Sequence, residues 1–407
     1  MTNSPGLEFV SRCSVLGIAV DMPTTETGTG KAKPAAGRDT SHRIAVLNRN
    51  DRPFHVVLAQ QFDRQIIEEL CRLADMIRSV SGSRQGAQFL RTMLSHRRAM
   101  LYFIQPSTRT FLSFTAACQI VGLPYNEVRD RSTSSEVKGE SEDDTIRVLS
   151  QYFDLIIMRH PAEGFAEHVA NMLNNMPRTI PVINGGSGKD QHPTQALLDI
   201  YTLLRSFSQP HPETGAESPP GSQRAARAEA LSYSRDVLAG KTITFVGDLR
   251  RGRTVRSLTY LLCRYPGVRM VFVAPPELQI DDDILDYISR HGIEYELSDD
   301  LRSHVGDCDA VYMTRLQDEW DVAGESKAID YSRYSLTRDM AKDFKPNLAI
   351  MHPLPRRHEL DQELDSVPQA KYWDQVRNGM WMRAALMASI FNVDAAIRDH
   401  YHAYYAF

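Results

Sequence analysis

The sequence contains few cysteines, no excess of positive charge and no long apolar run. It has 5 cysteines in 407 residues, none in a Cys-x-x-Cys pair, which argues against a disulfide framework and against a zinc site. We expect each cysteine to lie in a core, and a reducing, cytoplasmic location fits this usage best. No run reaches the roughly 18 apolar residues that cross a bilayer. The apolar stretch 15–20 lacks the length and the basic flank of a signal peptide, so we expect no membrane partner.

The charge balance argues against nucleic acid as a partner. Lys plus Arg total 47 and Asp plus Glu total 51, which gives a formal net charge of −4. A nucleic-acid-binding domain usually carries a basic excess. The apolar content of 42% is that of an ordinary globular protein, and at about 150 residues per domain the length predicts two to three domains. An anionic ligand would then be held by a local cluster of Arg and Lys.

Short apolar runs alternate with amphipathic segments along most of the chain. Strand-like runs at 99–104 and 155–158 are followed by helix-like segments at 110–121 and 162–173. This rhythm predicts an α/β protein with doubly wound parallel sheets. Further strands are expected at 180–183, 242–246, 270–273, 294–297, 310–313 and 348–351, and further helices at 61–80, 194–204, 224–236, 255–264, 283–290 and 379–397.

The sequence divides into a tail, two α/β halves and a final helix. Residues 1–42 lack apolar periodicity, and we expect a disordered extension there rather than a regulatory arm. The first half spans 43–193 and the second 194–378. Within the second, residues 207–223 are rich in Pro and Gly and are expected to form a surface loop insertion. The order of the elements alone does not assign the last helix to either half.

Polar motifs follow the predicted strands of the first half at their carboxyl ends, where ligands bind in open α/β sheets. Ser107-Thr108-Arg109-Thr110 begins a predicted helix, whose free N–H groups suit a phosphate. Arg159-His160-Pro161 follows a second strand, and Gln191-His192-Pro193-Thr194-Gln195 begins another helix. A histidine there can donate to a carbonyl oxygen or move a proton. Each motif alone also has a structural explanation, as a helix cap or a strand-end loop.

The second half repeats this arrangement. Val246-Gly247-Asp248 is followed by Gly252-Arg253-Thr254, which is not the Gly-x-Gly-x-x-Gly of a dinucleotide site. Thr314-Arg315-Leu316-Gln317 and His352-Pro353-Leu354-Pro355-Arg356 follow two further strands, and the tight Pro-Leu-Pro turn can aim a carbonyl at a ligand. Four arginines thus converge on the same edges, which implies a substrate with several negative charges. They are Arg109, Arg159, Arg253 and Arg315.

In this order the motifs resemble those of the aspartate/ornithine carbamoyltransferase family, over about residues 50–398. Ornithine-type members carry a His-Cys-Leu-Pro and a Ser-Met-Gly motif. Here Pro353 stands in place of that Cys, and Thr314-Arg315-Leu316-Gln317 in place of the second motif, so the chain is most similar to aspartate-type members. The resemblance implies a carbamoyl-phosphate domain (43–193 plus 379–407, with Arg383 on the returning helix), an aspartate domain (194–378), and neither metal nor organic cofactor.

The resemblance also implies a reaction and its residues. The amine of aspartate would attack the carbamoyl carbon of carbamoyl phosphate, giving N-carbamoyl-aspartate and phosphate for pyrimidine synthesis, largely by positioning and electrostatics. The implied catalytic residues are Arg109, Thr110, Lys138, Arg159 and His192. Those implied to bind carbamoyl phosphate are Ser107, Thr108, Arg109, Thr110, Ser134, Arg159, His192, Gln195, Leu354 and Pro355. Those implied to bind aspartate are Lys138, Arg159, Arg253, Arg315 and Gln317.

The resemblance also implies how subunits assemble, and the chain departs from the family pattern at one position of the phosphate motif. Ser134 and Lys138 match a segment that reaches in from a neighbouring subunit, which implies a homotrimer with shared active sites; regulatory or dihydroorotase subunits are further partners of such chains. The family's phosphate motif continues with Arg, whereas this chain has Phe111. We hypothesise that Glu140 is thereby left without its partner. A non-catalytic, scaffolding subunit and a transcarbamoylase with another amino acceptor remain the alternative interpretations.

Overall fold

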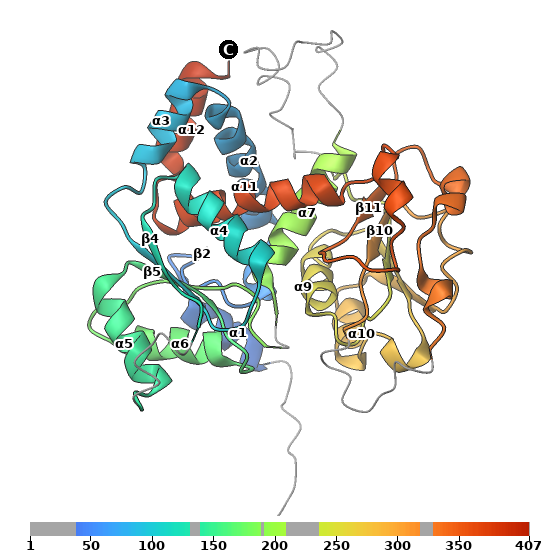
Figure 1. The fold of residues 1–407 in the computed structure, drawn as a ribbon, viewed down its shortest axis with the longest axis horizontal. Coiled ribbons are helices and arrows are strands. Elements are labelled where there is room, and N and C mark those ends of the chain that lie inside the picture. The colour runs from blue at the N-terminus through green and yellow to red at the C-terminus, as the bar shows by residue number, and fades with distance from the viewer. Residues whose placement is uncertain (1–37, 131–138, 189–190, 209–235, 318–328, 407) are drawn as a thin grey trace, which may run out of the picture.

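In the computed structural model, two parallel β-sheets covered by helices form the two halves of the protein (Figure 1). The structure describes residues 38–130, 139–188, 191–208, 236–317 and 329–406. All neighbouring strands within the two larger sheets pair in parallel. The predicted α/β fold with doubly wound parallel sheets is therefore confirmed.

The first sheet has the strand order β4-β3-β5-β6. Its strands are β3 (Ala99–Phe103), β4 (Tyr125–Val128), β5 (Leu155–Arg159) and β6 (Val182–Asn184). The central strands β3 and β5 are buried at every position, as expected where helices cover both faces of a sheet. The covering helices are α4 (Thr108–Ile120), α5 (Glu142–Tyr152) and α6 (Phe165–Asn174).

The second sheet has the strand order β11-β10-β7-β8-β9. Its strands are β7 (Thr242–Val246), β8 (Arg269–Val273), β9 (Glu294–Ser298), β10 (Ala310–Met313) and β11 (Ala349–Met351). The order turns around β7, so the loops after β7, β10 and β11 emerge at one edge of the sheet. Helices of this half are α9 (Arg253–Leu262), α10 (Asp282–Arg290) and the 3₁₀ helices η5 (Pro276–Leu278), η8 (Tyr331–Tyr334), η9 (Arg338–Asp343) and η10 (Gln362–Ser366).

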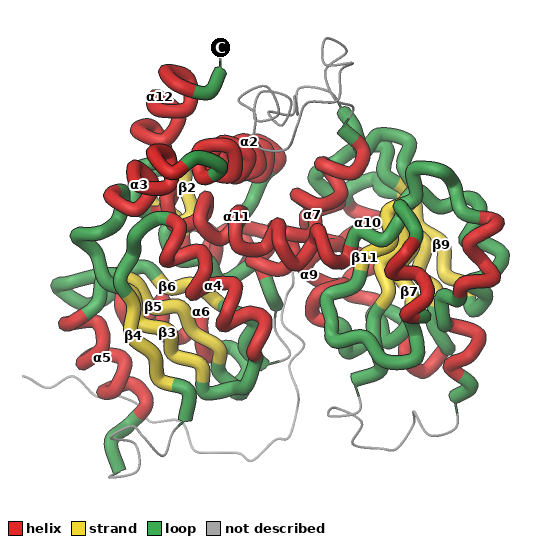
Figure 2. Tube along the Cα trace, turned by 45° about the horizontal axis from the view of Figure 1, so that its top comes forward, coloured by secondary structure: helices red, strands yellow, loops and turns green. Residues whose placement is uncertain are grey.

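Two long helices run between the sheets (Figure 2). Helix α7 (Pro193–Phe207) packs against α9 of the second half and against α11 (Tyr372–Ile390). Helix α11 also packs against α4 and α2 (Arg64–Ser81), so the C-terminal helix returns to the first half as expected. A Cβ atom at Gly379 would lie 3.2 Å from Leu198 Cδ2, so this glycine allows α11 to approach α7 closely.

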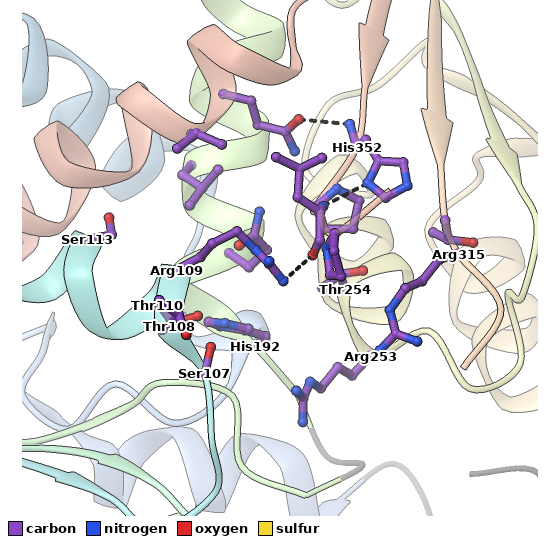
Figure 3. Close-up of a pocket in the computed structure, with 18 of the residues that line it drawn as sticks. Ser107, Thr108, Arg109, Thr110, Ser113, His192, Arg253, Thr254, Arg315 and His352 are labelled. Atoms are coloured by element: carbon purple, nitrogen blue, oxygen red, sulfur yellow. Dashed lines mark hydrogen bonds between the residues drawn. The ribbon is translucent and has the colours of Figure 1, made fainter. Parts of the chain in front are cut away.

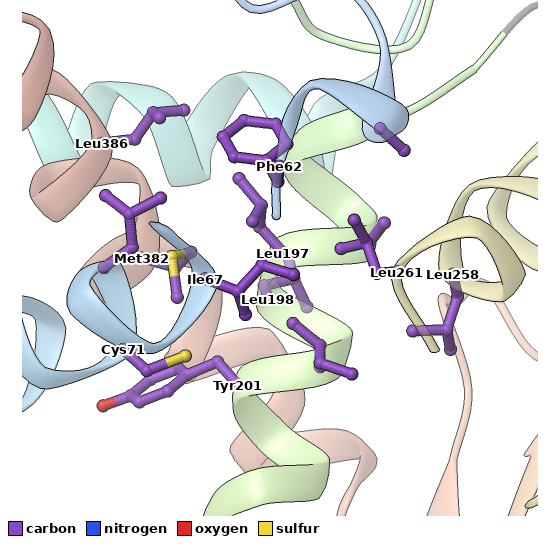
Figure 4. Close-up of a cluster of buried hydrophobic side chains, with 14 of the residues drawn as sticks. Phe62, Ile67, Cys71, Leu197, Leu198, Tyr201, Leu258, Leu261, Met382 and Leu386 are labelled. Carbon is purple, nitrogen blue, oxygen red and sulfur yellow. The ribbon is translucent and has the colours of Figure 1, made fainter. Parts of the chain in front are cut away.

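One cluster of buried apolar side chains extends through this helical layer (Figure 4). Phe62, which follows η1 (Ala59–Gln61), and Met382 from α11 meet Leu197 from α7. Leu258 from α9 belongs to the same cluster. The cluster therefore reaches helices of both halves, and it holds the carboxyl edges of the two sheets facing one another.

The C-terminal region differs from the sequence prediction of one helix over 379–397. It contains α11, which begins earlier at Tyr372, and a separate helix α12 (Asp394–Tyr404). Asn392 adopts a left-handed φ of +56° between them and so ends α11. Gly379, the predicted start of this helix, lies within α11.

The N-terminal boundary also requires a correction. Residues 38–42 were predicted to belong to a tail, but they form the start of α1 (Arg38–Leu47). Two contacts fix this helix: Leu47 is buried, and both nitrogens Nε and Nη2 of Arg43 donate to Glu167 of α6. A short antiparallel pair follows, β1 (Asn48–Arg49) with β2 (Arg52–Pro53).

Several elements escaped the sequence reasoning. Helix α3 (Arg84–Thr92), α5 and the edge strand β4 were not predicted. Helix α5 did carry a start signal, because Ser141 caps its first turn and three acidic residues follow it. The predicted loop 207–223 and helix 224–236 lie almost wholly outside the described residues. Over the part of the chain that the structure describes, no helix is long and apolar enough to cross a membrane.

Candidate active site

A cavity of about 650 Å³ opens between the carboxyl edges of the two sheets (Figure 3). The first half contributes the start of α4, the end of β5 and the start of α7. The second half contributes the start of α9 and the loops after β10 and β11. The lining includes these residues predicted from the sequence: Ser107, Thr108, Arg109, Thr110, Arg159, His192, Gln195, Arg253, Arg315, Gln317, Leu354 and Pro355. Ser134 and Lys138 lie outside the described residues.

The start of α4 presents hydroxyl and N–H donors to the cavity. Ser107 occupies the N-cap position, but its hydroxyl makes no capping hydrogen bond. Its side chain therefore does not serve the helix in the way an ordinary N-cap does. The next side chain, Thr108, also lines the cavity, and Thr110 is buried at its wall. Together with the positive end of the helix dipole, these groups suit a phosphate.

Arg159 ends β5 and is 7% exposed. Its Nη1 donates to the carbonyl of Gly185 at 3.1 Å, whereas its buried Nε has no acceptor among the described residues. A Cβ atom at Gly186 (φ +96°) would lie 2.7 Å from Arg159 Nη1 and 2.6 Å from His192 Cδ2. A glycine is therefore needed there for both side chains to enter the site.

His192 stands just before Pro193, which begins α7. Its backbone N–H donates to Ser257 Oγ of α9 at 2.9 Å, which ties this corner to the second half. Burial and the neighbouring guanidinium groups of Arg253 and Arg159 hold the pKa of His192 well below its usual value. The imidazole is therefore neutral near pH 7 and can donate a hydrogen bond without carrying charge.

The second half contributes cations and fixed polar groups. Arg253 begins α9 and reaches across to the carbonyl of Gly188 in the first half. Arg315 follows β10 and donates to the carbonyl of Leu316 at 2.8 Å. The backbone N–H of Gln317 donates to the buried Asp248 at 3.1 Å, which holds the loop after β10 against the loop after β7.

A chain of hydrogen bonds fixes the Pro-Leu-Pro turn after β11. The N–H of Leu354 donates to Nδ1 of His352 at 2.7 Å, so the ring proton lies on Nε2, which donates to Glu359 at 2.8 Å. Burial lowers the pKa of His352, in keeping with this neutral form. Leu354 has a left-handed φ of +56°, and its carbonyl accepts a hydrogen bond from Arg109 at 2.7 Å. The predicted turn therefore aims a carbonyl into the cavity.

The charged side chains in the described lining of the cavity are all arginines. Its described lining contains no carboxylate, while its arginines are Arg109, Arg159, Arg253, Arg315, Arg357 and Arg383. Burial and these like charges lower the pKa of both Arg109 and Arg159. A ligand that brings several negative charges removes this repulsion, and hydroxyls beside the cations can bind a phosphate. No group of three or more His, Cys, Asp and Glu able to hold a metal occurs within the described residues.

Some lining residues were missed by the sequence reasoning. Ser113 lies within one turn of the predicted motif on α4. Gln375 and Val376 come from α11, far along the chain. Helical spacing from Arg109 could have indicated Ser113, which lies four residues further along α4. No sequence signal marks the other two, since only the packing of α11 brings them to the cavity.

The hypothesis about Phe111 requires revision. Phe111 is 5% exposed, is absent from the cavity lining and meets Phe103 edge-to-face at 5.5 Å between ring centroids. The guanidinium of Arg129 lies over the Phe111 ring, 4.4 Å from its centroid. Glu140 is not left without a partner, because the hydroxyl of Thr145 donates to it at 3.0 Å. Position 111 is thus a core position in this chain.

Two stretches of the chain match domains of one known family. Residues 55–205 match the domain described as "Aspartate/ornithine carbamoyltransferase, carbamoyl-P binding domain". Residues 239–390 match the "Asp/Orn binding domain" of the same family. Together the two matches include all the strands of both larger sheets.

Similar proteins span nearly the same length. "Aspartate carbamoyltransferase 1, chloroplastic" of Pisum sativum is 36% identical over 338 residues, which are 82% of this chain and 77% of the relative. The aspartate carbamoyltransferase catalytic subunit of Methanosarcina acetivorans is 35% identical over 83% of this chain and 97% of its own length.

Solved structures share the fold. The catalytic subunit of M. jannaschii aspartate transcarbamoylase has a TM-score of 0.65 at 32% identity, covering 83% of this chain and 98% of that one. Aspartate transcarbamoylase from Trypanosoma cruzi in complex with carbamoyl phosphate and aspartate has a TM-score of 0.67 at 32% identity, covering 82% and 94%.

Proposed function

Because this chain belongs to the aspartate/ornithine carbamoyltransferase family, we infer that it transfers the carbamoyl group of carbamoyl phosphate to L-aspartate. The products are N-carbamoyl-L-aspartate and phosphate. The observation that carries this inference is the cavity between the two sheets, lined by six arginines and by no described carboxylate. Its two walls provide separate places for a phosphate and for a dicarboxylate.

We propose that the first half binds carbamoyl phosphate. Ser107, Thr108 and Arg109 would bind the phosphate at the start of α4, where N–H groups, hydroxyls and a guanidinium converge. Thr110, Arg159 and His192 would bind the carbonyl oxygen. Gln195 and, from the second half, the carbonyl of Leu354 would accept hydrogen bonds from the amino group.

The second half would bind aspartate. Arg253, Arg315 and Gln317 line this wall, and two guanidinium groups suit two carboxylates. The Ser-Met-Gly motif of ornithine-type members has no counterpart here, and a cationic wall repels the ammonium of ornithine. This argues against another amino acceptor, and the intact cationic cavity argues against a non-catalytic subunit.

The chemistry follows from these positions. The neutral amine of aspartate attacks the carbamoyl carbon, a C–N bond forms, and charge develops on the carbonyl oxygen. Arg159 and the neutral His192 donate to that oxygen, and the removal of one such donor typically lowers the rate by roughly 10²–10³. The C–O bond to phosphate then breaks, the proton released by the nitrogen passes to an oxygen of the departing phosphate, and the phosphate leaves towards Arg109.

We further propose a homotrimer in which Ser134 and Lys138 of one subunit complete the site of the next. A mixture of a Lys138→Ala and an Arg159→Ala subunit tests this sharing. Neither parent should be active, whereas random reassembly of trimers should restore about a quarter of wild-type activity, because one site in each mixed trimer is intact. A mixture that stays inactive after verified reassembly excludes sharing.

A cytoplasmic location remains our proposal, supported by the described cysteines Cys71, Cys118, Cys263 and Cys308, which are all free and buried. Plant relatives carry "chloroplastic" in their names. Localisation of the tagged full chain, with and without residues 1–37, distinguishes the two compartments. Regulatory or dihydroorotase subunits would appear as co-purifying chains in the same tagged preparation.

The acceptor is tested with carbamoyl phosphate labelled in its carbamoyl carbon. L-Aspartate and L-ornithine are supplied in parallel to purified protein. We expect labelled carbamoyl-aspartate and no citrulline. Citrulline as the main product would overturn the choice of aspartate, and no product from either acceptor would favour the scaffolding subunit.

A further inference from the structure

Behind the cavity lies a fully buried carboxylate that the proposed mechanism does not use. Asp199 of α7 is 0% exposed, and three side chains from three elements donate hydrogen bonds to it. Gln195 Nε2 lies 2.8 Å and Gln375 Nε2 lies 2.7 Å from Oδ1, and Tyr312 Oη lies 2.8 Å from Oδ2. One carboxylate thus joins α7, α11 and β10 directly behind the site.

The donor and acceptor roles in this network are fixed. The backbone N–H of His352 donates to Gln375 Oε1 at 2.9 Å, and a backbone N–H cannot reverse its role. Gln375 must therefore turn its Nε2 to Asp199, where Oδ1 accepts. Since the same Oδ1 also accepts from Gln195, the amide of Gln195 is held with Nε2 away from the cavity.

This orientation leaves the amide oxygen of Gln195 available to a ligand in the cavity. With Nε2 bound to Asp199, the remaining polar atom of this cavity-lining side chain is Oε1, for which the described residues provide no hydrogen-bond donor. An amide oxygen accepts hydrogen bonds and cannot donate them. A ligand that presents an NH₂ group to Gln195 satisfies it, whereas a methyl group leaves it unpaired.

We propose that Asp199 is a positioning residue that fixes the amide orientation of Gln195, and thereby makes the site prefer a carbamoyl donor to an acyl donor of the same shape. This rests on the proposed function, because carbamoyl phosphate and acetyl phosphate differ in NH₂ against CH₃. A site whose buried polar group is left unpaired by the wrong ligand discriminates strongly against it.

The charge state of Asp199 does not alter this polarity. Burial raises the pKa of Asp199 to about 7, while the facing groups are the Tyr312 hydroxyl of β10 and the Arg383 guanidinium of α11. A proton added to Oδ2 can be directed to the oxygen of Tyr312, which leaves Oδ1 as the acceptor of both amides. The same holds for Asn at this position, with its nitrogen towards Tyr312.

The test compares two constants for each variant: the KM of carbamoyl phosphate and the inhibition constant of acetyl phosphate against it. For Asp199→Leu we expect the first to rise about tenfold, the size of one lost hydrogen bond, and the second to stay within about twofold. Asp199→Asn should keep both constants within about threefold of wild type, because the His352 N–H still sets the polarity.

A matched control exists on the same two helices. Asn378 of α11 donates to Thr202 of α7 at 3.0 Å, a buried hydrogen bond that involves neither Asp199 nor Gln195. Asn378→Leu should leave the ratio of the two constants unchanged. A purely structural role of Asp199 predicts that Asp199→Leu moves both constants together, as would any general loosening of α7 against α11, and this result would overturn the proposal.

A second variant pair keeps the test decisive if Asp199→Leu does not fold. In the double variant Asp199→Asn with Gln375→Met, the anchor at His352 is gone and the amide of residue 199 can turn either way. We expect the double variant to lose the preference that Asp199→Asn alone retains; equal preference in both overturns the proposal. Wild-type protein without carbamoyl transfer would instead refute the proposed function, so the two failures are distinguishable.

Discussion

The guanidinium of Arg109 donates from Nη2 to the backbone carbonyl of Leu354 at 2.7 Å, across 245 positions of sequence. This bond joins the start of α4 in the first half to the turn after β11 in the second. The two groups are those assigned to the phosphate and to the carbamoyl amino group of one substrate. The groups that we propose to bind the two ends of carbamoyl phosphate thus lie within hydrogen-bond distance of each other, as one small substrate requires.

Removal of Arg109 tests the phosphate contact. Arg109→Ala is expected to lower kcat/KM for carbamoyl phosphate by about 10²–10³, because the cation nearest the leaving phosphate is lost. Steady-state kinetics with carbamoyl phosphate varied measures the effect. Arg290→Ala, an exposed arginine at the end of α10, is the matched control and should leave kcat/KM unchanged. A loss under threefold for Arg109→Ala would contradict the assignment.

Substitution of Arg315 should weaken the binding of one substrate and not of the other. Arg315→Met should raise the KM for aspartate about 100-fold, since a carboxylate loses its charged partner. The KM for carbamoyl phosphate should stay within about threefold, because the contacts proposed for that substrate do not include Arg315. Initial rates over a grid of both substrates measure the two constants. Equal weakening of both substrates would show that Arg315 supports the whole cavity rather than the aspartate wall.

Because Phe111 is buried outside the cavity lining, we expect its substitution to change stability rather than catalysis. Phe111→Arg would place a guanidinium among buried apolar groups and should lower the free energy of unfolding by about 3 kcal/mol. Phe111→Leu, which keeps an apolar side chain, should cost only about 1 kcal/mol. Thermal or urea denaturation measures both. If Phe111→Arg were as stable as wild type, the hypothesis that Glu140 lacks a cationic partner from position 111 would be supported again.

We expect the buried His55 to make the folded protein less stable in acid. Val182 N–H donates to its Nδ1 at 3.2 Å, so Nε2 carries the proton towards Asn174, and burial lowers the pKa of His55 to about 4. An unfolded histidine titrates near 6.5, so between pH 6.5 and about 4 the unfolded chain binds a proton that the folded chain does not. This contribution to stability is complete above pH 6.5 and falls by up to about 3 kcal/mol towards pH 4.

Denaturation midpoints measured from pH 4 to pH 7 test this assignment. His55→Gln removes the titrating ring and keeps polar atoms for the same neighbours. The variant should lose less stability between pH 7 and pH 4 than wild type does. Parallel curves for the two proteins would show that other groups cause the acid sensitivity.

Much of the site could be predicted because its residues lie in short motifs at strand ends. Arg159 is the last residue of β5 and Ser107 comes four residues after the end of β3. A parallel sheet brings such positions to one edge. Gln375 and Asp199 could not be found this way. Asp199 sits in an ordinary helical stretch, and only the tertiary packing of α7, β10 and α11 shows that its three donors converge. The division of the C-terminal region into α11 and α12 depended on one left-handed residue, Asn392, which periodicity does not reveal.

The central claim is that carbamoyl transfer to aspartate takes place in the arginine-lined cavity between the two sheets. Arg159 lines this cavity, is buried, and has an Nε for which the described residues provide no acceptor. The most direct measurement is carbamoyl-aspartate formation by wild type and by Arg159→Ala, each verified as folded. We predict formation by the wild type and a loss of at least about 10³ in the variant. Wild-type activity that persists in Arg159→Ala would contradict the account.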